Sequence, residues 1–215
     1  MVPQRPAPRL VEEWLVTWMH VRRLSSTPLD GWPRVHVGSR TRETEIVCTD
    51  PGADAFAALM RHVADDHRAM LTVLAADVGP YRRVPLLPGV RVDRDDETLM
   101  TTLLCDEPVP PLDPELTFRW DVEDGVTRYT VEAGDRVAAG GTVGVLGDVA
   151  TFDAVETMPQ FQRRGLGRHV MATLTVQAMG RGAERGILAA SAPGRALYTA
   201  LGWDVALEML SLMGD

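Results

Sequence analysis

The 215-residue sequence contains no long apolar run, no apolar core near its start and only two cysteines, and these absences argue against several classes of protein. Every apolar stretch is shorter than the roughly 18 residues that a membrane-spanning helix needs, and the first ten residues lack the apolar core of a secretory signal. Cys48 and Cys105 lie apart, in apolar stretches without metal-ligand spacing, which predicts two buried reduced thiols. We therefore expect a cytoplasmic protein with no metal cofactor.

Positive charge is also scarce in this sequence. The 22 basic residues, all of them arginine, are outnumbered by 30 acidic residues, so the formal net charge is -8. Nucleic acid needs a basic binding face, whereas an acidic protein attracts cationic small molecules by long-range steering. We expect a small-molecule partner, no nucleic acid and no membrane. The oligomeric state stays open, and a homodimer is among the assemblies that the sequence allows.

A proline-rich connector, Glu107 to Pro114, divides the chain into two patterned halves, because its prolines remove backbone donors and favour an extended conformation. Residues 1–110 would form a small α/β lobe and residues 115–215 a second domain. The first lobe is expected to contain a mobile arm over residues 1–10, a helix over 10–21 with Trp14 and Trp18 as packing residues, strands over 33–37 and 44–48, a helix over 54–65, a strand over 69–76 and two short strands within 89–105.

In the second half, Asp124-Gly125 between two alternating runs is a hairpin signal, and apolar residues at every fourth position after Gly165 predict a helix. The expected elements are strands over 116–122, 127–132, 136–146 and 151–157, a helix over 166–178, a strand over 186–190, a helix over 193–201 and a closing strand over 203–212.

The segment Gln-Arg-Arg-Gly-Leu-Gly, residues 162–167, stands between a predicted strand and a predicted helix. A helix start presents unpaired N–H groups and the positive end of the helix dipole, which together attract an anion. The two glycines allow close approach, and cationic donors are added by Arg163, Arg164 and Arg168. A pyrophosphate suits this loop, which lacks the Lys-Ser/Thr ending of a Walker P-loop and is shorter than a Rossmann fingerprint. The alternative is a tight turn without a ligand.

The pattern Gln/Arg-x-x-Gly-x-Gly resembles the pyrophosphate-binding loop of the GNAT superfamily of acyl-CoA N-acyltransferases, and Ser191 to Trp203 resembles the helix and Tyr-x-x-x-Gly-aromatic ending of those proteins. The resemblance covers residues 115–215. It implies an α/β (α+β) fold whose mixed, largely antiparallel sheet is flanked by helices and split between strands 151–157 and 186–190, where acetyl-CoA enters. Residues 1–110 resemble a degenerate GNAT half of a two-lobed member, which would form part of the acceptor site.

By the same resemblance, strand backbone before the loop would bond the pantetheine arm, and an N–H there would polarise the acetyl carbonyl or hold its developing oxyanion. The loop would bind the pyrophosphate, and Ser191 would keep a polar contact to CoA or water. The residues implied in cofactor binding are Val155, Thr157, Met158, Gln162, Arg163, Arg164, Gly165, Leu166, Gly167, Arg168, Ser191 and Tyr198.

Tyr198 falls at the position of the family's general acid, a phenol that protonates the departing thiolate, and it also fits an aromatic that only packs. The attacking amine needs a base, for which Asp153 and Glu156 are the candidates. Strand alternation places these two carboxylates on opposite faces unless a bulge re-aims one of them. Thr151 stands where other members carry a glutamate base, and His169 is expected at the surface.

These implications favour an N-acetyltransferase that moves an acetyl group from acetyl-CoA to a primary amine of a small molecule, by direct attack in a ternary complex. Two alternatives stay open. A CoA-binding or regulatory module would keep the loop without turnover, which the missing base at Thr151 motivates. A GNAT-fold O-acyltransferase would use another acceptor atom.

Overall fold

The computed structural model describes residues 7–215, whose strands hydrogen-bond into one eleven-stranded sheet. Its strands are β1 Ser25–Leu29, β2 Trp32–His36, β3 Thr44–Thr49, β4 Ala69–Ala75, β5 Val90–Leu103, β6 Thr117–Glu123, β7 Val126–Ala133, β8 Arg136–Leu146, β9 Val149–Thr157, β10 Arg185–Ala190 and β11 Asp204–Gly214. Its helices are α1 Ala7–Arg22, α2 Ala53–Ala64, α3 Gly79–Arg82, α4 Leu166–Met179 and α5 Ala192–Ala200, with a 3-10 turn, η1, at Pro159–Phe161.

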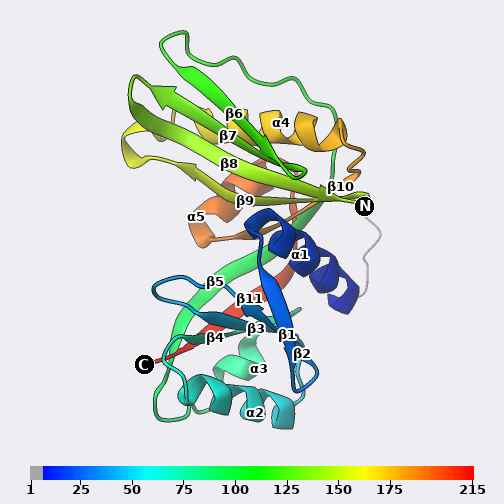
Figure 1. Cartoon of the computed structure of the whole chain (residues 1–215), viewed down its shortest axis with the longest axis vertical. Coiled ribbons are helices and arrows are strands. Elements are labelled where there is room, and N and C mark those ends of the chain that lie inside the picture. The colour runs from blue at the N-terminus through cyan, green and yellow to red at the C-terminus, as the bar shows by residue number, and fades with distance from the viewer. Residues whose placement is uncertain (1–6) are drawn as a thin grey trace.

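The strand order in the sheet is β1-β2-β3-β4-β11-β5-β10-β9-β8-β7-β6. Figure 1 shows β6 to β10 with α4 and α5 in one part of the molecule, and β1 to β4 with α2 and α3 in the other. Two strands cross between these parts. β5, from the first half of the chain, pairs antiparallel with β10, and β11, the last strand, pairs antiparallel with β4. Because β5 and β11 also pair with each other, one mixed sheet flanked by helices runs through the molecule.

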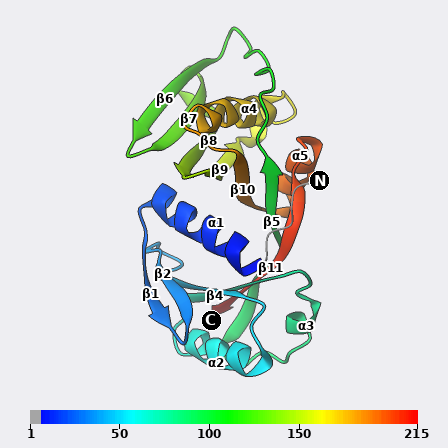
Figure 2. The same ribbon diagram turned by 90° about the vertical axis from the view of Figure 1, so that its right-hand side faces the viewer.

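Helix α1 lies between the two parts of the molecule (Figure 2) and packs on β8 and β9. Its core stripe includes Trp14 and Trp18, which are buried as predicted and stack with ring centroids 5.6 Å apart. Gly144 in β8 permits this approach, since a Cβ there would lie 2.6 Å from Cγ2 of Val21. The start of the chain therefore covers the strands that lead into the glycine loop.

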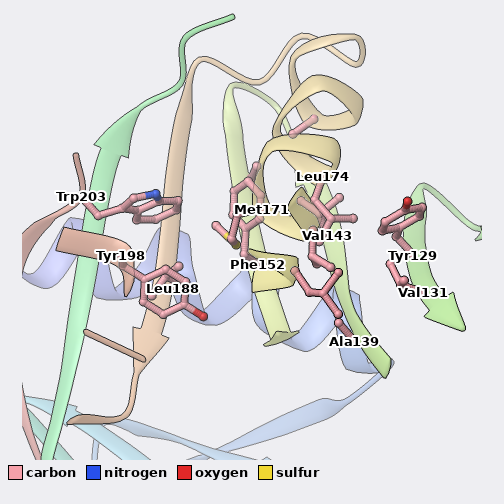
Figure 3. Packing of buried hydrophobic residues seen from close by; sticks show 14 of the residues in the cluster. Tyr129, Val131, Ala139, Val143, Phe152, Met171, Leu174, Leu188, Tyr198 and Trp203 are labelled. Atoms are coloured by element: carbon pink, nitrogen blue, oxygen red, sulfur yellow. The ribbon is translucent and has the colours of Figure 1, made fainter. Parts of the chain in front are cut away.

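The part that contains α4 and α5 has its own core, shown in Figure 3. Phe152 of β9 meets Trp203 edge-on at 5.4 Å between ring centroids, and Leu174 of α4 is fully buried in the same cluster. Truncation of a fully buried leucine to alanine costs about 2–5 kcal/mol. This core fixes α4 against the strands that precede it.

The strands differ from the expected ones in two places, for identifiable reasons. Residues 89–105 contain one long strand, β5, instead of two, because register shifts against β11 carry the ladder through the Asp-rich stretch. β1 has no counterpart among the expected strands. Asp30 and Gly31 both have positive φ and make the tight turn that pairs the polar β1 with β2. The expected arm is corrected in part, since residues 7–10 belong to α1, whereas residues 1–6 lie outside the described residues.

The two cysteines differ in environment. Cys48 is buried as expected, and burial raises the pKa of its thiol. Cys105 is exposed, contrary to expectation, because it follows the end of β5 and enters the connector. Both thiols are free. None of the helices within residues 7–215 is long and apolar enough to cross a membrane.

Candidate active site

The predicted split in the sheet lies between β9 and β10. These parallel strands pair only from Val149 opposite Arg185 to Thr151 opposite Ile187, and the rest of β9 has no ladder with β10. Backbone groups on that edge of β9 are therefore open to a ligand that adds as a strand.

The backbone of β9 alternates between this open edge and β8. Met158 donates its N–H to the carbonyl of Ala138 at 2.9 Å, and Thr157 stands opposite Ala139. In an antiparallel ladder this pattern makes Thr157 and Ala139 a non-hydrogen-bonded pair, so the backbone groups of Thr157 point to the open edge. The expectation for Met158 needs correction, because its N–H is already occupied by β8.

The loop that follows β9 is shaped by its own side chains. Gln162 donates Nε2–H to the carbonyl of Thr157 at 3.1 Å, which ties the loop back to the strand. Arg163 and Gly165 have positive φ values of 63° and 80°, and Gly165 is the N-cap of α4. The first helical bond runs from the N–H of His169 to the carbonyl of Gly165 at 3.0 Å. The N–H groups of the preceding helical residues therefore have no partner within the helix.

The two loop glycines serve different physical needs. Gly165 has open space around its Cα, and its left-handed backbone is one that only glycine adopts without strain. Gly167 sits where α5 comes close, since a Cβ there would lie 2.9 Å from Cδ2 of Leu197. Both glycines are expected to allow a phosphate to approach. Gly167 also allows α5 to pack closely against the loop.

The three loop arginines are not equivalent. Arg164 forms an ion pair with Asp113 at 2.8 Å and stacks over Phe161, while Arg168 donates to the carbonyl of Ala200 at 3.4 Å. The backbone N–H of Glu115 and then the Arg164 guanidinium lower the pKa of Asp113. Arg163 makes no ion pair with any residue of the described range 7–215. Arg163 is accordingly the arginine most available to an incoming anion.

Tyr198 lies on α5, the helix that follows β10. Its side chain is 7% exposed, and its ring centroid lies 6.0 Å from that of Trp203. Burial, with a smaller contribution from the charge of Asp153, raises the pKa of Tyr198 to about 12. Figure 3 shows its hydroxyl directed away from Trp203. A phenol in this environment keeps its proton at neutral pH, which is the state that a general acid needs.

Ser191, at the start of α5, has a structural partner. Its Oγ accepts a hydrogen bond from the N–H of Gly194 at 3.4 Å, which makes it the N-cap of the helix. The predicted polar contact from Ser191 to CoA or water would have to use the remaining capacity of this hydroxyl.

A cleft of about 780 Å³ opens on the sheet face that α1 covers. Its walls come from the end of α1, the loop after β2 and strands β6 to β9, and both candidate bases line it. Asp153 stands opposite Thr142 and Glu156 opposite Gly140, with a register shift between them and a positive φ of 50° at Ala154. This bulge places Asp153 and Glu156 on the same face, as the sequence required for both to reach one site.

The two carboxylates differ in their partners. Arg22, at the end of α1, donates two hydrogen bonds to Asp153, from Nε to Oδ2 at 2.6 Å and from Nη2 to Oδ1 at 2.9 Å. The hydrogen bond to Asp153 raises the pKa of Arg22. Glu156 makes no ion pair with any other described residue. No sequence signal pointed to Arg22, because 131 residues separate it from Asp153.

Two polar residues near the site are buried, and for His169 this differs from the expectation. Thr151 is fully buried and its hydroxyl has no partner among residues 7–215, and a threonine hydroxyl cannot take the place of the carboxylate base that other members carry there. His169 is 7% exposed rather than at the surface. Its Nδ1 lies 2.7 Å from the carbonyl of Pro110 and its Nε2 lies 2.7 Å from the hydroxyl of Tyr129. Because a carbonyl only accepts, Nδ1 donates, and His169 ties the connector to the first turn of α4.

Comparison with known proteins agrees with this geometry. Residues 94–203 match the model of the acetyltransferase (GNAT) family, which is half of the chain, so the chain belongs to that family of acyl-transferring proteins. Members of the family use acetyl-CoA. No curated protein matches the chain.

Solved structures share the fold at low sequence identity. A GCN5-related N-acetyltransferase from Kribbella flavida matches with a TM-score of 0.68 and 16% identity, over 99% of this chain and 96% of that chain. A GNAT-family protein from Novosphingobium aromaticivorans matches with a TM-score of 0.61 and 18% identity, over 99% of this chain and 98% of that chain. A tandem GNAT protein from the clavulanic acid biosynthesis pathway matches with a TM-score of 0.58 and 14% identity, over 98% of this chain and 89% of that chain. The chain therefore has the GNAT fold.

Proposed function

We propose that this protein is a cytoplasmic N-acetyltransferase, which moves an acetyl group from acetyl-CoA to a primary amine of a small molecule in a ternary complex. One observation carries the proposal. Three features adjoin β9: the loop and start of α4 follow it in the chain, the cleft that contains Glu156 opens on it, and the charge of its Asp153 reaches the protonated phenol of Tyr198.

In this proposal the cofactor follows the open edge of β9. The pyrophosphate lies against the N–H groups at the start of α4, with Arg163 as its nearest free cation. The pantetheine arm pairs with the backbone of Val155 and Thr157. An N–H of one of these two residues takes the place expected for Met158 and stabilises the charge that develops on the acetyl oxygen.

Glu156 is the base that the geometry favours. Its carboxylate lines the cleft without an ion pair, whereas Asp153 is held by Arg22. Glu156 takes a proton from the attacking amine, directly or through one water, as the new C–N bond forms. When the C–S bond breaks, Tyr198 gives its phenolic proton to the departing thiolate. Asp153 then acts by holding α1, and with it one wall of the cleft, against β9.

We also propose that residues 1–110 are a degenerate GNAT-like lobe that builds the acceptor site, and that residues 115–215 are the acetyl-CoA-binding domain. The β3-α2-β4 unit of the first lobe has the same parallel connection as β9-α4-β10, and the resemblance to a tandem GNAT protein supports this division. The end of α1 and the loop after β2 line the cleft from the first lobe.

Two measurements test the proposal in sequence. CoA at about 100 times its dissociation constant should stabilise the protein by ~2.7 kcal/mol, and an unchanged melting temperature would rule out the cofactor site. Thiol release from acetyl-CoA with a panel of small primary amines should then show turnover. Mass spectrometry of the acceptor should show one added acetyl group on nitrogen.

A CoA-binding module without turnover is the second candidate, favoured by the buried Thr151 and by the Arg22 grip on Asp153. Stabilisation by CoA with no thiol release for any amine would select it. Thiol release with alcohols but not with amines would instead indicate the O-acyltransferase.

A further inference from the structure

The two edges of the sheet are β1 and β6, and they differ in how they resist pairing with another strand. β1 is five residues long, polar, and contains Pro28, features that protect natural edge strands. β6 spans Thr117–Glu123, contains no proline, and has every residue exposed. β6 is thus the edge left available for strand addition.

The turn that joins β6 to β7 determines which backbone groups of β6 are free. Asp124 and Gly125 have φ values of 50° and 78°, as in a type I′ turn, so Glu123 and Val126 form a hydrogen-bonded pair. Counting back from Glu123, every second residue of β6 likewise directs its backbone N–H and C=O groups toward β7. The N–H and C=O groups that point to the free edge therefore belong to Phe118, Trp120 and Val122.

The sequence of β6 is complementary to itself when a second copy runs antiparallel and Trp120 faces the partner's Trp120. On one side of the sheet, Phe118 then meets the partner's Val122. This contact covers apolar residues that are exposed in the single chain, Phe118 at 57%, Trp120 at 37% and Val122 at 57%. On the other side, Arg119 meets the partner's Asp121. That position is the non-hydrogen-bonded one, where cross-strand side chains approach most closely.

The backbone and the side chains select the same register. We propose that β6 pairs with β6 of a second copy of this chain, about a two-fold axis at Trp120, to form a homodimer with one continuous sheet. The three outward residues of each copy make three hydrogen-bonded pairs, and each pair exchanges two backbone bonds. An unrelated strand would satisfy the same backbone groups but not the Arg119–Asp121 arrangement, which only a self-pairing strand repeats on both sides of the axis.

Sedimentation velocity of the full chain over a concentration series tests this interface. A reversible monomer–dimer equilibrium is expected, because one strand edge buries less surface than an obligate interface does. Arg119→Asp makes the residues that face each other at positions 119 and 121 both acidic, and Asp121→Arg makes them both basic. Each variant alone should be monomeric at concentrations where the natural chain dimerises, and an equimolar mixture should recover a dimer.

Arg61→Asp, at an exposed position of α2, is the matched control, because it changes the net charge as Arg119→Asp does and should leave the dimer intact. Val122→Pro gives a second test that leaves the charges unchanged. It removes an outward N–H that the hairpin itself does not use, and it should also abolish the dimer. Melting curves establish that each variant is folded. A chain that is monomeric throughout, or a dimer that survives Arg119→Asp and Val122→Pro, would overturn the proposal.

Discussion

Two β-α-β units of this protein use the same connection with different results. In the first, β3 and β4 stay paired from Thr44 opposite Ala69 to Thr49 opposite Leu74, and α2 begins directly after Gly52. In the second, β9 and β10 separate after Thr151, and a longer loop with two left-handed residues precedes α4. A helix start is common to both units. What distinguishes the second is the opened strand pair, which exposes backbone groups beside that helix start.

The largest effect should come from removal of the proposed base in the second unit. Glu156→Gln should lower kcat about 10²–10⁴-fold, because the amine loses its proton acceptor, with CoA affinity nearly unchanged. Steady-state thiol release and calorimetric titration measure the two quantities. Glu43→Gln, at an exposed ion pair before β3, is the control and should leave the rate as it is. If the Glu156→Gln protein were fully active, Glu156 would not be the base, and Asp153 would be the remaining candidate.

Removal of the proposed acid should have the next largest effect. Tyr198→Phe should lower kcat about 10²-fold, since the thiolate loses its proton donor. Activity that needs a protonated phenol is present below its pKa and lost as pH rises through it. With that pKa raised to about 12, the natural protein should show no decline from this group up to about pH 10.

The matched control for the acid lies in the first part of the molecule. Tyr81→Phe removes a buried hydroxyl that donates to Asp50 at 2.7 Å, so it should lower stability without a change in the pH profile of kcat. An alkaline decline near the ordinary tyrosine pKa of about 10, present in the natural protein and absent from Tyr198→Phe, would mean that burial does not raise the pKa of Tyr198.

The two helix N-caps offer a smaller and more direct comparison. Gly165→Ser places a side chain on a residue with φ of 80°, at a cost of about 1–2 kcal/mol, and should weaken CoA binding about tenfold. Gly52→Ser, at the N-cap of α2 with φ of -60°, meets no such strain and should keep or slightly raise stability. Calorimetry with CoA and melting curves distinguish the outcomes. Equal effects at both positions would mean that backbone conformation does not set the two loops apart.

The smallest effect concerns the contact between α1 and β9. Arg22→Gln should lower stability by about 1 kcal/mol or less, a shift of roughly 2–4 °C in Tm, since the ion pair is partly exposed and solvent screens it. Arg23→Gln, which removes a more exposed pair with Glu123, is the control and should shift Tm less. If Arg22→Gln lowered kcat strongly while Tm changed by only the few degrees expected, Asp153 would have a direct role in the reaction.

Much of the fold could be predicted because its signals are local. The stripe of Trp14 and Trp18, the turn at Asp124-Gly125 and the glycine loop before α4 each depend on residues close together in sequence. Asp30-Gly31 carries a similar turn signal, and attention to it would have found β1. The split between β9 and β10 followed from family resemblance rather than from any local pattern.

The details of the site depended on partners far away in the chain. The Met158 N–H is occupied because Ala138 lies opposite it, and Asp153 is held because α1 lies on β9. His169 is buried because the connector and Tyr129 cover it. The sequence by itself determined the helix start, its glycines and the phenol of Tyr198, since backbone preference and residue chemistry act over a few positions. Only the tertiary structure decided which backbone edge is open and which carboxylate is unpaired, because strand register and ion pairing join residues that the sequence keeps apart.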